Sequence, residues 1–186
     1  MTKSKVFLFG CLGVIVALVL IFGLMAMSTY NRLVQLDEDV SQSWAQVENQ
    51  YQRRYDLIPN LVKTVEGAAD FERETLQNVI EARSRVAQAP AGGQDAGNIT
   101  EDPAAFQQFA QAQQSLGGAL SRLLVVVERY PELKANQNFL DLQAQLEGTE
   151  NRIAVERMRY NESAQRFNTV VRRFPANLFA TIFGFE

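Results

Sequence analysis

The sequence predicts an all-α protein in which a single N-terminal transmembrane helix continues into an antiparallel up-down bundle of four long helices. Three observations predict this fold. Residues 6–27 are uncharged and apolar. Apolar residues then recur at spacings of three and four along most of the chain, which is typical of helices that bury one face. Prolines and glycines gather at a few breaks between those stretches.

The apolar segment Val6–Met27 contains no charged residue and no proline. As a helix it would be roughly 33 Å long, enough to cross the hydrocarbon core of a bilayer. Lys3 and Lys5 precede it, whereas Arg32 is the first charge after it and acidic residues follow. By the positive-inside tendency, residues 1–5 stay in the cytoplasm and the chain from about residue 30 lies outside it.

Two alternatives to a membrane anchor fit the N-terminal sequence less well. A cleaved signal peptide would have a shorter apolar core and a small-x-small cleavage site, and residues 24–27 make a poor one. A lipidated Cys11 would need most of the apolar residues before it, but most of them follow it. We therefore favour an anchor in which Cys11 is an apolar thiol that faces lipid or a neighbouring helix.

Composition excludes several function classes. The 186 residues include no histidine and one cysteine, so a disulfide within the chain is impossible and histidine- or cysteine-based metal sites and catalysis are not expected. The net charge is −3, and the part after the anchor is more acidic still because two lysines precede the anchor. This acidity argues against binding nucleic acid. Nothing in the sequence calls for a cofactor.

The first helix of the bundle covers residues 29–56, with no glycine or proline between it and the anchor. Proline disfavours helical geometry at the residue before it, so Pro59 predicts a turn at Leu57–Pro59 and a second helix over 59–88. A single kinked helix remains open, because the apolar rhythm runs through Ile58 to Val62.

The remaining breaks delimit two further helices. Residues 89–103 are rich in glycine and proline and predict a flexible loop. Asp102 followed by Pro103 is typical of a helix start, so a third helix is expected over 103–130. The fourth is expected over 136–174, with Asn138 and Asp141 as a capping box.

Residues 176–186 form an apolar tail after the bundle domain of residues 28–175. In an up-down bundle the fourth helix ends beside the bilayer. The tail is therefore expected to contact the lipid interface or a neighbouring copy, although it could instead fold back under the bundle. The residues expected to make this contact are Leu178, Phe179, Ile182, Phe183 and Phe185.

Several motifs resemble those of the LemA family, and together they cover the anchor and nearly all of the domain. The most specific is the string RRYDLIPNLV at residues 53–62. The resemblance implies a bacterial inner-membrane protein, anchored at its N-terminus, with an extracytoplasmic helical bundle and a poorly defined biochemical role. Where the family often has a histidine, residues 67–72 read GAADFE. The other matching motifs are YNRLV at 30–34, WAQV at 44–47, EAR at 81–83, YPELKA at 130–135, LQ at 142–143 with Leu146, TE at 149–150, Arg157 with YN at 160–161, and the closing proline with FGF at 183–185.

A cluster of polar residues is expected where the fourth helix passes the first. The favoured interpretation is a set of ion pairs that fixes the register of the helices, and a binding site for an anionic group is the alternative. Carboxylate catalysis is not expected, because no pair of acidic residues comes with a pocket. The cluster comprises Arg53, Arg54, Asp56, Glu150, Arg157, Tyr160 and Asn161.

The sequence therefore predicts a non-enzymatic, membrane-anchored scaffolding protein of the bacterial envelope. Its expected partners are membrane lipid and further copies of itself, bound through helix faces and the apolar tail. The alternative is an accessory or sensor subunit of another envelope protein, such as a membrane protease, that does not self-assemble stably.

Overall fold

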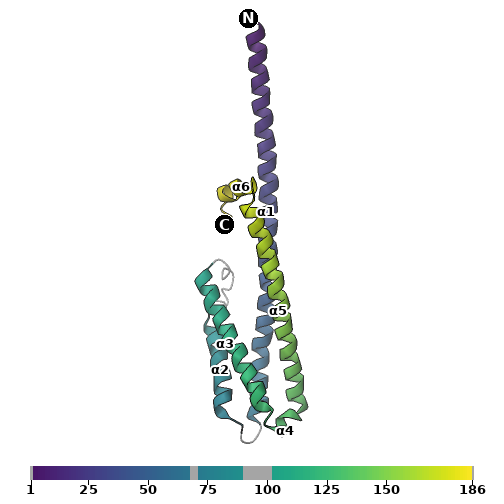
Figure 1. Ribbon diagram of the computed structural model, residues 1–186, viewed down its shortest axis with the longest axis vertical. Helices are drawn as coiled ribbons and strands as arrows, with labels where there is room; N and C mark the ends of the chain where they lie inside the picture. The colour runs from purple at the N-terminus through teal and green to yellow at the C-terminus, as the bar shows by residue number, and fades with distance from the viewer. Residues whose placement is uncertain (1, 68–70, 90–101, 186) are drawn as a thin grey trace. The chain divides into compact units, whose positions relative to one another are not determined.

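The computed structural model describes residues 2–67, 71–89 and 102–185, with side chains from Leu12 onward (Figure 1). These residues form helices and contain no strand, which confirms the all-α prediction. Cys11 and most of the predicted loop at 89–103 lie outside the described side chains, so neither prediction is tested. The helices are α1 (Thr2–Glu66), α2 (Arg73–Gln88), α3 (Pro103–Val127), α4 (Pro131–Lys134), α5 (Gln137–Arg172) and α6 (Ala176–Phe183).

Helix α1 runs without interruption from the apolar segment to Glu66. It is the one helix in the described part of the chain that is long and apolar enough to cross a membrane. Its most apolar window has a mean hydropathy of 2.5, and no part of that window is buried inside the protein. The large side chains there, such as Leu20 and Leu24, are more than half exposed.

The predicted turn at Leu57–Pro59 is wrong, because Pro59 lies inside α1. The expected second helix over 59–88 is therefore wrong as well, and α2 begins only at Arg73. An internal proline removes one backbone hydrogen bond and costs about 3 kcal/mol. Ile58, Leu61 and Val65 flank it and are fully buried. Each such side chain stabilises the fold by about 1.5–3 kcal/mol, so together they outweigh the proline.

The chain divides into two compact units, which are described separately. The first comprises residues 1–47 and 155–186, and the second comprises residues 48–154. Helices α1 and α5 each contribute one part to each unit.

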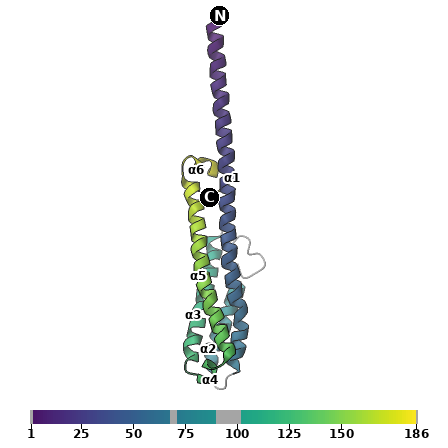
Figure 2. The same cartoon turned by 90° about the vertical axis from the view of Figure 1, so that its right-hand side faces the viewer.

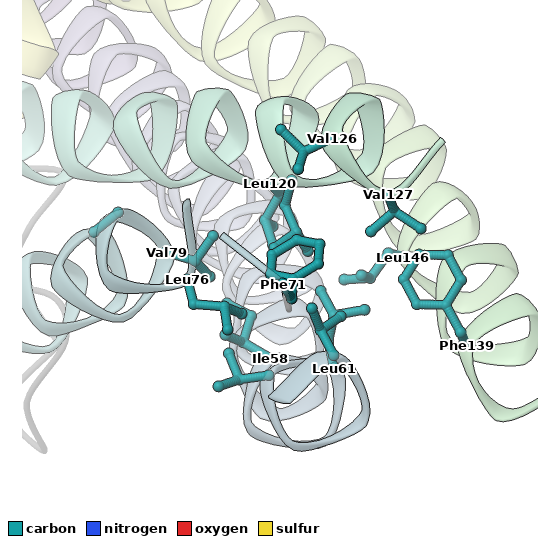
Figure 3. Packing of buried hydrophobic residues seen from close by; sticks show 14 of the residues in the cluster. Ile58, Leu61, Phe71, Leu76, Val79, Leu120, Val126, Val127, Phe139 and Leu146 are labelled. Atoms are coloured by element: carbon teal, nitrogen blue, oxygen red, sulfur yellow. The ribbon is translucent and has the colours of Figure 1, made fainter. Parts of the chain in front are cut away.

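The second unit has a continuous hydrophobic core to which α1, α2, α3, α4 and α5 all contribute (Figure 3). Phe71, in the connection after α1, packs its ring against that of Tyr130, with the centroids 4.9 Å apart. The core residues labelled in Figure 3 are Ile58, Leu61, Phe71, Leu76, Val79, Leu120, Val126, Val127, Phe139 and Leu146.

Local side-chain chemistry explains where α3 begins. Asp102 Oδ1 accepts hydrogen bonds from the backbone N–H groups of Ala104 and Ala105, at 2.8 and 3.2 Å, and Pro103 occupies the first turn. The predicted start of the third helix is thereby confirmed. The helix ends at Val127, and Pro131 opens the short helix α4 instead of only ending α3.

The start of α5 differs from the predicted capping box. Asn136, not Asn138, supplies the cap, and its Oδ1 accepts from the N–H groups of Asn138 and Phe139 at 3.0 and 3.3 Å. Asp141 instead accepts a hydrogen bond from Gln137 Nε2 at 2.9 Å. Residue 136 fits better because its side chain precedes the first unpaired N–H groups of the helix, where a cap is needed.

In the first unit, residues of α1 contact α5 and α6 in reverse order of number. Ser43 shares a hydrogen bond of 2.9 Å with Ser163, and the rings of Trp44 and Tyr160 lie 5.3 Å apart. Further toward the N-terminus of α1, the contacts are with α6, which Figure 2 shows beside α1 after the end of α5.

Gly184 ends α6 and turns the chain back. Its φ of 78° is in the left-handed region that glycine adopts readily. The turn lets Phe185 N–H donate to the carbonyl of Ala180 at 3.0 Å. It also places the Phe185 ring 6.0 Å from that of Tyr30 and 6.3 Å from that of Phe167.

Candidate functional site

Arg54 is the centre of the polar contacts in the second unit. Its side chain is only 3% exposed. Nη1 donates to Glu150 Oε2 at 2.6 Å, and Nη2 donates to both the backbone carbonyl and the side-chain oxygen of Gln113. The guanidinium therefore links α1 to α3 and to α5.

The position of Arg54 on α1 explains its burial. It lies between Tyr51 and Ile58 at the three- and four-residue spacing of the buried face. The guanidinium carbon lies 5.3 Å from the centre of the Tyr51 ring, a distance suited to a cation–π contact. Gly117 of α3 faces Nη1, where a Cβ would lie 3.8 Å away. A Cβ at that distance would make ordinary van der Waals contact, so the arginine does not require a glycine here.

The electrostatics of the Arg54–Glu150 pair are asymmetric. Glu150 is 61% exposed, so its carboxylate keeps much of its hydration while it compensates a buried charge. A pair that is buried on both sides would lose hydration twice. The geometry is that of a clamp between helices, because the charged atoms of Arg54 are turned inward.

The structure brings two of the seven predicted cluster residues into direct contact, namely Arg54 and Glu150. Arg53 and Asp56 are exposed, and Asp56 accepts a hydrogen bond from Gln52 at 2.8 Å. The other three belong to the first unit, where Arg157 and Asn161 are also exposed.

Tyr160, the last of the predicted cluster residues, packs against Trp44 in the first unit. Burial raises the pKa of its hydroxyl above the usual 10.0. The tyrosine is thus neutral at physiological pH and unsuited to act as a base there.

Sequence reasoning missed Gln113, which binds Arg54. A signal was present, since Gln113 occupies a position between Phe109 and Leu116 in the apolar stripe of α3. A polar residue at such a position points into the core and needs a partner there. Ser163 and Thr149 are buried polar residues of the same kind.

The predicted apolar tail forms α6 and the turn after it. Phe179 is 2% exposed and its ring lies 5.0 Å from that of Phe22 on α1. Phe183 and Phe185 lie edge-on to Tyr30, at 5.0 and 6.0 Å. On the adjacent face of α6, which we call its outward side, Leu178 is 49% exposed and Ile182 is 71% exposed, and Phe183 itself is 41% exposed.

Within the residues that the structure describes, no three histidine, cysteine, aspartate or glutamate side chains gather where they could hold a metal ion. The features described above are contacts between helices and exposed apolar side chains. The fold and these contacts define a class: an all-α protein with one exposed apolar N-terminal helix and helices joined by an arginine clamp.

Comparison with known proteins shows the family of the chain. The model of the LemA family matches residues 43–186, and the chain belongs to this family. Magnetosome proteins MamQ 1 and MamQ 2 of Paramagnetospirillum magneticum are each 29% identical to it over 169 residues, or 84% of this chain and 62% of theirs. Protein LemA of Metamycoplasma hominis is 24% identical over 150 residues, or 81% of this chain and 63% of its own length. The chain thus spans less than two thirds of the length of these curated relatives.

Proposed function

We propose that this protein is a non-enzymatic scaffold of the bacterial inner membrane that self-associates beside the bilayer. In this proposal the apolar part of α1 is the anchor and residues 1–5 are cytoplasmic. The rest of α1 forms an antiparallel four-helix bundle with α2, α3 and α5 on the periplasmic side. The apolar helix α1 and the membership of the LemA family support the anchor. The two lysines before the apolar segment support the orientation.

The observation that carries the proposal is the position of α6. Phe179 contacts Phe22, which lies inside the apolar segment of α1, and Phe183 contacts Tyr30, which lies just after it. If residues 6–27 cross the bilayer, these contacts hold α6 at its surface. One face of α6 contacts α1, and its exposed apolar residues are then available to lipid or to a second copy.

Self-association is assigned to the outward side of α6, where Leu178 and Ile182 are one helical turn apart. The names of the MamQ relatives attach them to magnetosomes, which are structures of the cell. A structural role for this chain is consistent with such relatives. It is also consistent with a sequence that lacks histidine and has its one cysteine in the apolar segment.

Site-directed cross-linking in native membranes tests the proposal. In a Cys11→Ser background, Ile182→Cys introduces the only thiol on the outward side of α6. Mild oxidation should give a disulfide-linked dimer on a non-reducing gel. The matched control is Glu81→Cys, which is also exposed but lies on α2, and which should stay monomeric.

Equal cross-linking from both positions, or none from Ile182→Cys, would overturn self-association through α6. A stoichiometric cross-link from Ile182→Cys to a different protein, with no dimer, would overturn it in favour of the accessory-subunit alternative.

A further inference from the structure

We propose that a cleft between α1 and the end of α5 binds the phosphate of an anionic phospholipid. This inference rests on the proposed anchoring by α1 and adds a lipid class to it. The cleft lies wholly within the first unit and has a volume of about 650 Å³, which is in the range of small-molecule sites.

The cleft is lined by residues of two kinds that matter for a ligand. Three arginines line it, namely Arg32 from α1, Arg166 from α5 and Arg173 just after α5. Apolar side chains, including Met25 and Phe174, also line it. A ligand that suits both kinds of residue has an anionic group and a hydrocarbon part, and guanidinium groups bind phosphate oxygens with paired hydrogen bonds.

Few acidic residues lie near the arginines of the cleft in the sequence, and the nearest is Glu162, one turn before Arg166. Residues 22–36 and 163–185 contain no aspartate or glutamate. Within the described part of the chain, none of the three arginines forms an ion pair, and Arg166 donates only through Nε to the carbonyl of Glu162 at 3.3 Å. The guanidinium groups are therefore available to an external anion.

The level of the cleft along α1 matches the headgroup layer. Arg32 follows the end of the apolar segment by five residues, which is about 7.5 Å along a helix. The headgroup layer on each side of a bilayer is about 5–8 Å thick. Met25, by contrast, lies within the apolar segment. The cleft therefore extends from the hydrocarbon core into the headgroup layer, as a lipid does with its acyl chains and its phosphate.

An anionic headgroup fits better than a zwitterionic one. Phosphatidylcholine would bring its own quaternary ammonium group close to three guanidinium groups, whereas phosphatidylglycerol adds no cation. Free phosphate would satisfy the arginines but would not contact the apolar side chains that line the cleft.

Native mass spectrometry of the full-length protein in an uncharged detergent tests the inference. Titration with dioleoyl phosphatidylglycerol should show one lipid bound more tightly than dioleoyl phosphatidylcholine, and sodium phosphate should not displace it. Arg166→Gln and Arg173→Gln should each weaken phosphatidylglycerol binding by about fivefold, the effect of one basic residue near an anionic membrane. The matched control is Arg172→Gln, which removes the same charge from the neighbouring residue but does not line the cleft.

Equal weakening by Arg172→Gln and Arg173→Gln would overturn the site, because it would show diffuse attraction only. Equal binding of the two lipids would also overturn it, and displacement by sodium phosphate would reassign the cleft to a free anion. Carbonate extraction of membranes reports separately on the anchor. A protein that resists extraction but does not prefer phosphatidylglycerol would defeat this inference and leave the proposed function standing.

Discussion

Arg54 shows how a single buried charge can organise several helices without any catalytic role. Three hydrogen bonds compensate it, and one of them is to an exposed carboxylate. The cost of a missing partner is unequal on the two sides of the pair. Removal of Glu150 leaves a cation in the core, whereas removal of Arg54 leaves a carboxylate that is already in contact with water.

Glu150→Gln should therefore lower the free energy of unfolding by about 2 kcal/mol, because the buried guanidinium loses its counter-charge. The double variant Arg54→Met with Glu150→Gln should be more stable than Glu150→Gln alone, since it no longer buries a charge. Chemical unfolding followed by circular dichroism in mild detergent measures both. The control is Arg85→Gln, which breaks an exposed pair with Glu81 and should change stability by less than about 0.5 kcal/mol. A double variant less stable than Glu150→Gln would contradict this account.

The sequence could show that Arg54 and Glu150 belonged to one group, but not which members of that group meet. Helical periodicity gives the face on which a residue lies, whereas a contact also depends on the axial register of two helices far apart in the chain. Gln113 was accessible as a polar break in an apolar stripe. Arg32, Arg166 and Arg173 were not, because nothing local links positions so distant in sequence.

At the scale of the helix, the sequence predicts helix ends well where local capping determines them, and poorly where tertiary packing determines them. Asp102 and Pro103 begin α3 as expected, because the cap and its N–H partners are within three residues of one another. Pro59 did not end the helix because its effect competes with the burial of α1 against four other helices, which no local rule includes. The apolar rhythm through Ile58 was the better indicator.

Pro59→Ala tests this competition. If Pro59 lies within a continuous helix, alanine restores a backbone hydrogen bond and should raise the free energy of unfolding by about 2 kcal/mol. The same unfolding measurement applies. Pro103→Ala is the matched control, because proline in the first turn lacks only an N–H that has no helical partner, so alanine should bring no gain. A loss of stability in Pro59→Ala would indicate that the chain does turn there.

At the scale of the whole molecule, two units share two continuous helices. Residues 48–66 of α1 and 137–154 of α5 belong to the second unit, and the preceding part of α1 and the following part of α5 belong to the first. Hydrophobic periodicity alone did not reveal this division, because it continues along each helix past the boundary. Because α1 and α5 run through both units without a break, we expect unfolding of one unit to destabilise the helix ends of the other.

Leu123→Ala should therefore destabilise both units together. Leu123 is fully buried in the core of the second unit, and such a truncation costs about 3 kcal/mol. Trp44 is the only tryptophan and lies in the first unit against Tyr160, so its fluorescence reports on that unit alone. Thermal unfolding should show the Trp44 transition falling in temperature along with the circular dichroism transition. Val125→Ala, on the same helix but 67% exposed, should move neither. An unchanged Trp44 transition in Leu123→Ala would mean that the units unfold separately. In that case α1 and α5 could unfold up to about residues 47 and 155 without destabilising the first unit.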